Sequence, residues 1–196
     1  MASPSVSLAV EPRGRLFTAA DLAKMPTHLP SGDVDFELDQ GRLIVMVPPG
    51  HLHGSTQTRL GAALFVQGEQ AGHGRAFTEV GLVLSRKPDT VVGPDVAFIT
   101  TAKLPVHESP EGYLETIPDL VVEIRSRNDT TAELDSKVAA YLAAGVRSVW
   151  VADPIAKTIV AHQSNISPRT YTESDTITLD DPIPGFRLDV ADVFRN

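Results

Sequence analysis

The stretch Pro118-Asp-Leu-Val-Val-Glu123-Ile-Arg-Ser126 places a carboxylate inside an otherwise apolar run. Residues 120–124 are apolar except for Glu123 and are preceded by proline, which predicts a short buried strand. A carboxylate in such a strand is costly unless a metal ion, a cation or hydrogen bonds compensate its charge. Glu123 is therefore a candidate functional residue. The alternative is a buried ion pair with Arg125 or Lys137.

The residues on both sides of this stretch predict a mixed α/β sheet with helices packed on it. Thr130 and Glu133 form a capping pattern, and the apolar stripe that follows ends at Gly145, which predicts a helix. Residues 147–152 form the next predicted strand. Before the central stretch we expect a long helix over 53–71 and strands over 76–84 and 95–99. The order helix, three strands, helix, strand favours an α+β mixed-sheet fold.

The two ends of the chain add smaller elements. Residues 1–17 are predicted to be a flexible arm, and residues 18–196 a single domain that opens with a short helix capped by Thr18. A hairpin that turns at Gly41 carries Glu37. The segment 101–117 is predicted to be a long loop, 158–188 several short strands, and 189–194 a last short helix.

Composition excludes several classes of protein. The chain has 196 residues, no cysteine and a formal net charge of −8, so disulfides, thiolate zinc sites and thiol nucleophiles are absent. The negative charge argues against tight nonspecific binding to duplex nucleic acid, although a local basic groove stays possible in principle. There is no apolar run of about 20 residues and no secretory signal pattern, so we expect a cytoplasmic protein without a membrane span.

Asp95 and Glu123 lie at predicted neighbouring strands and could together hold one divalent cation. Mg²⁺ prefers hard oxygen ligands, and a bound Mg²⁺ polarises phosphates and acidifies water. Asp119 is a poorer partner, because four residues of strand would separate it from Glu123 by about 13 Å.

Each candidate also has a structural interpretation: Asp95 as a turn residue after proline, and Lys137 as a helical partner of Glu133. His51 and His53 have no third ligand nearby in sequence, which disfavours zinc.

The sequence resembles the Uma-type family of "putative restriction endonucleases", which is assigned to the PD-(D/E)XK nuclease superfamily. The resemblance extends from about Thr18 to the C-terminus and is most specific between Pro118 and Pro154. The matching segments are Glu37-Leu-Asp-Gln-Gly41, Val47-Pro-Pro with His53, Pro94-Asp-Val-Ala-Phe98, Pro118-Asp-Leu-Val-Val-Glu123-Ile-Arg-Ser126, Lys137 with Tyr141-Leu-Ala-Ala-Gly145-Val, Val149-Trp-Val-Ala-Asp153-Pro and Pro184-Gly-Phe-Arg-Leu188.

The resemblance implies a restriction-endonuclease-like core and a Mg²⁺-dependent (or Mn²⁺-dependent) endonuclease that hydrolyses phosphodiester bonds of nucleic acid, DNA before RNA. It implies that Asp95, Glu123 and the backbone carbonyl of Ile124 bind the metal. The catalytic lysine of the superfamily is then replaced by Lys137 on the following helix, where it acts on the phosphate or the water. Glu37 would add a carboxylate. A homodimer is also implied.

Three further residues are candidates for substrate contact or support of the site, namely His53, Arg125 and Ser126. Arg125 stands where the superfamily motif has lysine, and strand alternation predicts that it shares a face with Glu123. Gly93 stands where the family often has a basic residue. These departures, with the charge of −8, support an alternative function: a catalytically silent homodimeric binding protein that retains the nuclease fold, with Arg125 paired to Glu123 in place of a metal.

Overall fold

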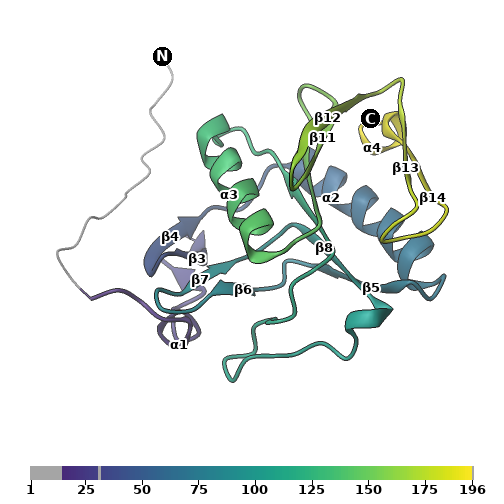
Figure 1. Ribbon diagram of the computed structural model, residues 1–196. Coiled ribbons are helices and arrows are strands. Elements are labelled where there is room, and N and C mark those ends of the chain that lie inside the picture. Colours follow the sequence, from purple (N-terminus) through teal and green to yellow (C-terminus); the bar gives the residue numbers. More distant parts are fainter. Residues whose placement is uncertain (1–14, 31, 196) are drawn as a thin grey trace, which may run out of the picture.

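The computed structural model of the protein describes residues 15–30 and 32–195 (Figure 1). Most of the predicted flexible arm, residues 1–14, lies outside the described residues. From Arg15 onward the chain is tied to the domain, since Arg15 pairs with Asp21 and the Phe17 N–H donates to Gly41 O at 2.9 Å.

The centre of the fold is a six-stranded mixed sheet. Its only parallel pair is β9 with β10, and its other neighbours are antiparallel. The parallel pair requires a crossover connection, and α3 supplies it. In spatial order the strands are β12 (Ile166–Thr172), β11 (Thr158–Gln163), β10 (Ser148–Asp153), β9 (Leu120–Ile124), β8 (Val96–Thr100) and β5 (Gly74–Thr78).

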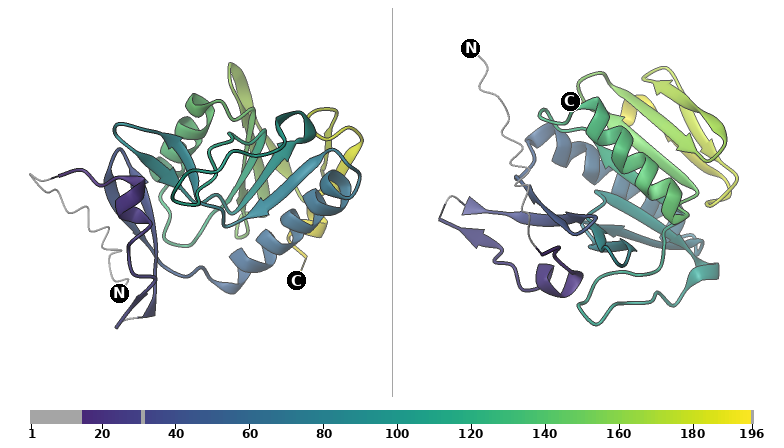
Figure 2. Two further views of the ribbon diagram at one scale, coloured as in Figure 1. Left: turned by 90° about the horizontal axis from the view of Figure 1, so that it is seen from below. Right: turned by 60° about the vertical axis from the view of Figure 1, so that its left-hand side comes forward.

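The two long helices cover opposite faces of this sheet (Figures 1 and 2). Helix α2 (His51–Leu64) packs Leu60 and Leu64 into a core with Val122 of β9 and Trp150 of β10. Helix α3 (Thr131–Ala144) packs on the other face, where Tyr141 meets Val121. Because side chains alternate along a strand, Glu123 lies on the α3 face together with Val121.

A second, four-stranded sheet lies beside the α3 face and carries the N-terminal hairpin. Its order is β4 (Arg42–Met46), β3 (Asp35–Asp39), β7 (Thr90–Val92) and β6 (Leu82–Ser85). The predicted hairpin is confirmed, and Gln40 and Gly41 form its turn with φ of 51° and 76°. Such a two-residue turn with positive φ at both positions suits the right-handed twist of paired strands. Helix α1 (Ala19–Leu22) packs next to β3, capped by Thr18 as expected.

The C-terminal part follows the prediction, with several short strands over residues 158–189 and a last short helix over 190–193. The first two of these strands belong to the main sheet, and the pieces over residues 176–193 pack onto its α2 face. The additional elements are β1 (His28–Leu29), β2 (Gly32–Asp33), β13 (Thr176–Leu179), β14 (Phe186–Asp189), α4 (Val190–Val193), the π-helical segment η1 (Phe65–Glu69) and the short 3₁₀ helix η2 (Thr101–Lys103).

The fold class predicted from the sequence is confirmed, but one predicted strand is wrong. Residues 76–84 form two strands in different sheets, β5 and β6, because the chain turns at Glu79, whose φ is 53°. Gly81 follows that turn, and a Cβ there would lie 2.5 Å from the ring of Tyr113, so the close approach requires glycine. The three-residue strand β7 was also not predicted.

The long helices begin and end close to their expected positions. Helix α3 has the predicted capping box between Thr130 and Glu133, and it ends at Gly145 with φ of 102°. Helix α2 begins at His51, two residues before the expected start, and its last turns continue as η1. None of the helices among residues 15–30 and 32–195 has the length and apolar character needed to cross a membrane.

Asp119 anchors the end of β9 that lies away from Glu123. Its side chain is 1% exposed, with Oδ1 3.0 Å from Lys103 Nζ and 3.7 Å from Arg147 Nη1. The Thr100 N–H donates to Oδ2 at 2.9 Å. Burial raises the pKa of this carboxyl, but the Thr100 N–H and the Lys103 ammonium outweigh it, so the pKa lies below its ordinary value. The charged form therefore stabilises the fold above the ordinary pKa and less so below it.

We expect Asp119→Asn to lower the free energy of unfolding by about 1–3 kcal/mol at pH 7. The difference from the wild type should shrink as the pH falls below about 4, where the wild-type carboxylate is protonated on unfolding. Urea unfolding at several pH values measures both effects, with the exposed Asp180→Asn as the control. A difference that is independent of pH would contradict the assigned ion pairs.

Candidate active site

Glu123 is a buried member of a cluster that α3 completes from above the sheet. Its side chain is 7% exposed, and its Oε1 accepts a hydrogen bond of 2.5 Å from the Tyr141 hydroxyl. Its Oε2 lies 3.7 Å from Lys137 Nζ. Lys137 and Tyr141 are four residues apart, so they lie on one face of α3 and both reach the same carboxylate.

Asp95 lies immediately before β8 and faces the end of β9. Its Oδ2 accepts a hydrogen bond of 2.6 Å from the Ile124 N–H, and its Oδ1 lies 3.2 Å from His53 Nε2. The N–H and C=O of one residue in a strand point to the same edge, so the Ile124 carbonyl also lies on the Asp95 side of β9. The predicted pair of neighbouring strands therefore does bring Asp95, Glu123 and the Ile124 carbonyl to one end of the sheet.

Glu37 reaches the same cluster from the four-stranded sheet. Its side chain is 6% exposed and its two oxygens lie 3.2 Å from Lys137 Nζ. Oε1 also accepts a hydrogen bond of 2.8 Å from the Gly93 N–H. Its Oε2 is buried and accepts no hydrogen bond from the described residues. Lys137 thus bridges Glu37 and Glu123, carboxylates that belong to two different sheets.

The charges of the cluster do not balance. Asp95, Glu123 and Glu37 are each less than 10% exposed, and Lys137 is the cation placed between two of them. With all four groups ionised, the formal charge is −2. Burial raises the pKa of Glu123, and the positive charge of Lys137 lowers it. The negative charges of Asp95 and Glu37 raise this pKa further, whereas the hydrogen bond from Tyr141 lowers it. The resulting pKa of Glu123 is about 7. The cluster therefore holds more negative charge than its own cation compensates.

The same carboxylates shift the pKa values of the two basic side chains beside them, Lys137 and His53. Burial alone would lower the pKa of Lys137, but Glu123 and Glu37 raise it well above its ordinary value, so the ammonium is permanently charged. Burial likewise would lower the pKa of His53, and the hydrogen bond and charge of Asp95 raise it overall. His53 Nδ1 is buried with no hydrogen-bond partner among the described residues.

The donor set fits a small divalent cation. All its ligand atoms are hard oxygens, and a dication would neutralise the formal charge of −2 that the cluster carries when its four groups are ionised. Apart from its ion pair with Lys137, Glu37 Oε2 is buried and accepts no hydrogen bond from the described residues. Residues 15–30 and 32–195 hold no ready-made group of three or more metal-binding His, Asp or Glu side chains. Mg²⁺ does not need one, since it is usually held by one or two carboxylates and keeps several waters.

Arg125 and Ser126 lie outside the cluster. In the described part of the chain the ion pair of Arg125 is made with Asp153, at 3.4 Å, and a second nitrogen donates to Thr131 at 2.7 Å. The expected pairing of Arg125 with Glu123 is therefore wrong. Strand pairing continues to Arg125, whose N–H donates to Ala152 O at 2.8 Å, but its side chain is paired with Asp153 at the end of β10 and with Thr131 at the start of α3. The Ser126 N–H donates to Asp129 in the loop before α3.

The comparisons with known proteins identify the family of the chain. The sequence matches the family described as "Uma2: Putative restriction endonuclease" over residues 19–191. The chain belongs to the Uma2 family.

A solved structure similar to this Uma2 protein is described as "a putative nuclease belonging to DUF820 from Anabaena variabilis ATCC 29413". The two share 17% sequence identity with a TM-score of 0.73, and the match covers 91% of this chain and 97% of the other. That likeness shows a shared fold. The comparison with curated proteins gave no match. The resemblance inferred from the sequence is thus confirmed at the level of family and fold, and family membership supports a nuclease function.

Three residues of this Uma2 site were missed as functional candidates. Tyr141 was assigned to the apolar stripe of α3, although its spacing of four from Lys137 is a usable signal. Gly93 was seen only as a lost basic side chain, whereas its backbone N–H holds Glu37. Gln57 of α2 donates to the Asp95 backbone carbonyl at 3.0 Å, and no sequence pattern indicated that contact.

We expect Glu123→Gln to be more stable than the wild type in metal-free buffer at pH 8. The pKa of about 7 in the folded protein exceeds the ordinary value of 4.5, so the wild type loses stability as the pH rises from 4.5 to 7. The glutamine variant has no such loss. Its advantage should therefore grow over that interval and level off above it.

Thermal melting in EDTA between pH 5 and pH 8 measures this effect, with the exposed Glu108→Gln as control. If the difference in melting midpoint between the variant and the wild type does not change with pH, the ionisation of Glu123 does not destabilise the folded protein.

Proposed function

We propose that the protein is a metal-dependent endonuclease that hydrolyses phosphodiester bonds of nucleic acid, with DNA as the preferred substrate. The observation that carries the proposal is the burial of three carboxylates from three elements at one end of the sheet, two of them, Glu37 and Glu123, paired with a single lysine; the formal charge is −2 when all four groups are ionised. Stable domains rarely bury such an excess of charge for structural reasons, because desolvation exceeds what the ion pairs return. Membership of a family described as a putative restriction endonuclease supports the choice of substrate.

In this proposal Asp95, Glu123 and the Ile124 carbonyl hold Mg²⁺ or Mn²⁺. When bound, such an ion polarises a phosphate oxygen and lowers the pKa of a coordinated water. Asp95 is held for this role from two sides, by the Ile124 N–H at 2.6 Å and by His53 Nε2 at 3.2 Å. His53 is thus a positioning residue, which restricts the rotation of the Asp95 carboxylate.

Lys137 is proposed to stabilise negative charge on the scissile phosphate. Its ammonium sits on a 24% exposed side chain between two buried carboxylates, so its position is fixed before substrate arrives. A preorganised cation in a poorly hydrated site is worth more than one in water, because no reorganisation is needed during the reaction. Glu37 fixes this position and is the remaining acceptor for a water proton.

We expect Mg²⁺ or Mn²⁺ to raise the melting midpoint of the wild type and not that of Asp95→Asn. A ligand that binds only the native state adds about 2.7 kcal/mol at a hundredfold excess over its dissociation constant. In the same buffers the wild type should nick plasmid DNA, and Asp95→Ala and Glu123→Ala should not. Asp180→Ala, an exposed site, is the control. Metal-independent melting and no cleavage by the wild type would refute the proposal.

We expect Lys137→Gln to reduce the cleavage rate by about a hundredfold or more at saturating metal. The same variant loses the internal cation of the cluster, so its melting midpoint in EDTA should drop. The shift that Mg²⁺ produces should be larger than in the wild type, because more negative charge is left for the metal to neutralise. The half-exposed Lys157→Gln is the matched control. An unchanged cleavage rate, or a smaller Mg²⁺-induced shift in melting midpoint than in the wild type, would contradict the proposed role of Lys137.

The alternative function, a catalytically silent binding protein, is supported by Lys137 and not by Arg125, the residue on which the sequence-based alternative depended. Arg125 does not replace the metal, but Lys137 partly does, since it lies within 4 Å of both Glu37 and Glu123. If this internal ion pair is the final state, divalent cations leave the melting midpoint unchanged. The melting experiment therefore separates the two functions. The homodimer and the cytoplasmic location stay predictions.

A further inference from the structure

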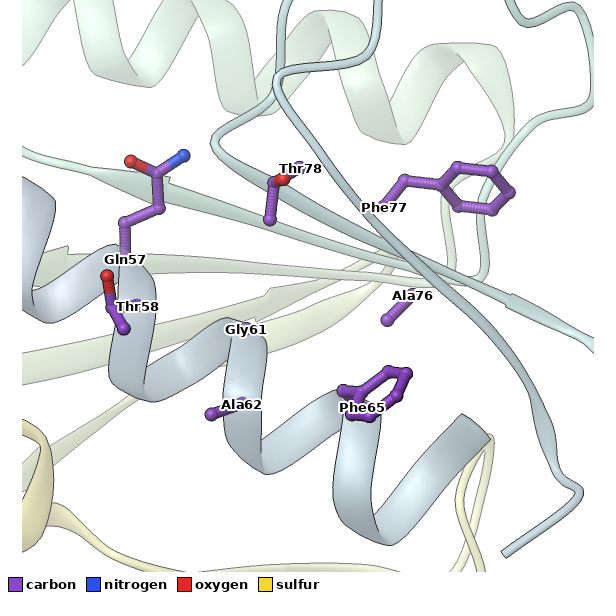
Figure 3. Close-up of a pocket in the computed structure, with 8 residues that line it drawn as sticks. All are labelled: Gln57, Thr58, Gly61, Ala62, Phe65, Ala76, Phe77 and Thr78. Atoms are coloured by element: carbon purple, nitrogen blue, oxygen red, sulfur yellow. The ribbon is translucent and has the colours of Figure 1, made fainter. Parts of the chain in front are cut away.

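An open groove runs between α2 and β5, next to the carboxylate cluster (Figure 3). Its volume is about 520 Å³, within the range of about 300–1,000 Å³ in which proteins bind small molecules. It is open to solvent along one side. The residues that line it are Gln57, Thr58, Gly61, Ala62, Phe65, Ala76, Phe77 and Thr78.

The lining is uncharged and has the shape of a slot. Gly61, Ala62 and Ala76 have small or absent side chains, and the ring of Phe65 lies opposite Ala76 (Figure 3). Phe65 is 44% exposed, which is unusual for a phenylalanine that packs beside a sheet. Hydrogen-bonding side chains, those of Gln57, Thr58 and Thr78, lie at the other end of the groove (Figure 3). The slot thus combines an aromatic face with amide and hydroxyl groups.

The walls of the groove are held at a fixed separation. The Ala76 N–H of β5 donates to Glu69 at 2.8 Å, which ties the strand to the π-helical segment η1. Gly68 in that segment packs so close to Phe98 that a Cβ there would lie 2.5 Å from the ring. Phe65 is the first residue of η1. Such π-helical turns are rare and occur frequently at functional sites.

One side chain, that of Gln57, connects the groove to Asp95. Gln57 lines its polar end, and the same side chain donates to the Asp95 carbonyl at 3.0 Å. A group seated in the groove is therefore one side chain away from Asp95. Because the groove carries no charged side chain, it suits the neutral part of a nucleotide and not its phosphate.

We propose that this groove binds one unpaired nucleobase of the strand whose phosphodiester lies at Asp95 and Glu123. The inference rests on the proposed function and adds the substrate class, nucleic acid with a single-stranded or flipped-out nucleotide beside the cleaved bond. A base inside a duplex has both faces covered, so it cannot enter a slot of this kind unless it leaves the stack. Stacking on Phe65 is tolerant of sequence, since every base has a π-face. The formal charge of −8 fits a protein that grips a base rather than a long duplex.

Gly61 provides a direct test, because it leaves the slot open. A Cβ on Gly61 would have Thr78 Cγ2 as its nearest neighbour, at 3.5 Å, which is an ordinary contact. Alanine therefore fits, whereas leucine would project into the groove and fill it. Both replace glycine within α2, so both gain helix propensity.

We expect Gly61→Leu to weaken binding of a short oligothymidylate by about tenfold, and Gly61→Ala to leave it unchanged. Fluorescence anisotropy with Ca²⁺ in place of Mg²⁺ measures the affinity. A second strand, with tetrahydrofuran abasic residues throughout, keeps the phosphates and lacks the bases. On that strand Gly61→Leu should bind as the wild type does.

Phe65→Ala gives a second reading if Gly61→Leu does not fold. It should lose a similar factor on oligothymidylate and nothing on the abasic strand, and Val66→Ala, which is 53% exposed, is its neighbouring control. Equal losses on both strands, unchanged binding in Gly61→Leu and Phe65→Ala, or no binding by the wild type would overturn the groove assignment. Base-dependent binding without any cleavage in Mg²⁺ or Mn²⁺ would support the groove and refute the nuclease.

Discussion

The arrangement depends on burying more carboxylates than cations at one end of a sheet. Glu37, Asp95 and Glu123 converge where water is largely excluded, and Lys137 compensates only part of their charge. Three donors are directed at the carboxylate oxygens: the Tyr141 hydroxyl at Glu123, the Gly93 N–H at Glu37 and the Ile124 N–H at Asp95. The surrounding fold thus holds in place a group of charges that would otherwise move apart or take up protons.

Strand pairing explains how residues distant in sequence meet at this point. Antiparallel pairing of β8 with β9 places Val96 opposite Val122, so Asp95 arrives beside the last residues of β9. The parallel pairing of β9 with β10 requires the crossover helix α3, which returns over the Glu123 face. Lys137 and Tyr141 therefore reach Glu123 as a consequence of the crossover. One topological choice, a single parallel pair, brings the cation and the hydroxyl to the carboxylate.

How much of the site the sequence could predict differs from residue to residue. Glu123 could be found because a carboxylate in an apolar strand is chemically anomalous, and Asp95 because it matches a known motif. The roles of Gly93 and Gln57 could not be found, since one acts through a backbone N–H and the other through a contact between a helix and a strand end. The partner of Arg125 was wrong because Asp153 and Thr131, which neighbouring elements bring beside it, could not be recognised from the sequence.

The fold was predicted where local signals are strong and missed where they compete. Capping residues and glycine set the limits of α3, and the Gln40–Gly41 turn set the hairpin. By contrast, residues 76–84 are continuously strand-like, and only the left-handed backbone at Glu79 divides them between two sheets. The groove was invisible for a related reason. Its two walls come from successive elements, α2 with η1 and then β5, and neither has a distinctive sequence pattern by itself.

Glu37 is the member of the cluster that comes from the four-stranded sheet, and this gives the hairpin of β3 and β4 an influence beyond its size. Its outer strand β4 is an edge strand with exposed apolar side chains at Ile44 and Val45. A contact at this edge would act on a carboxylate of the candidate active site through two paired strands. A partner bound at the exposed edge of β4 would therefore alter the position of Glu37 without contacting the site itself.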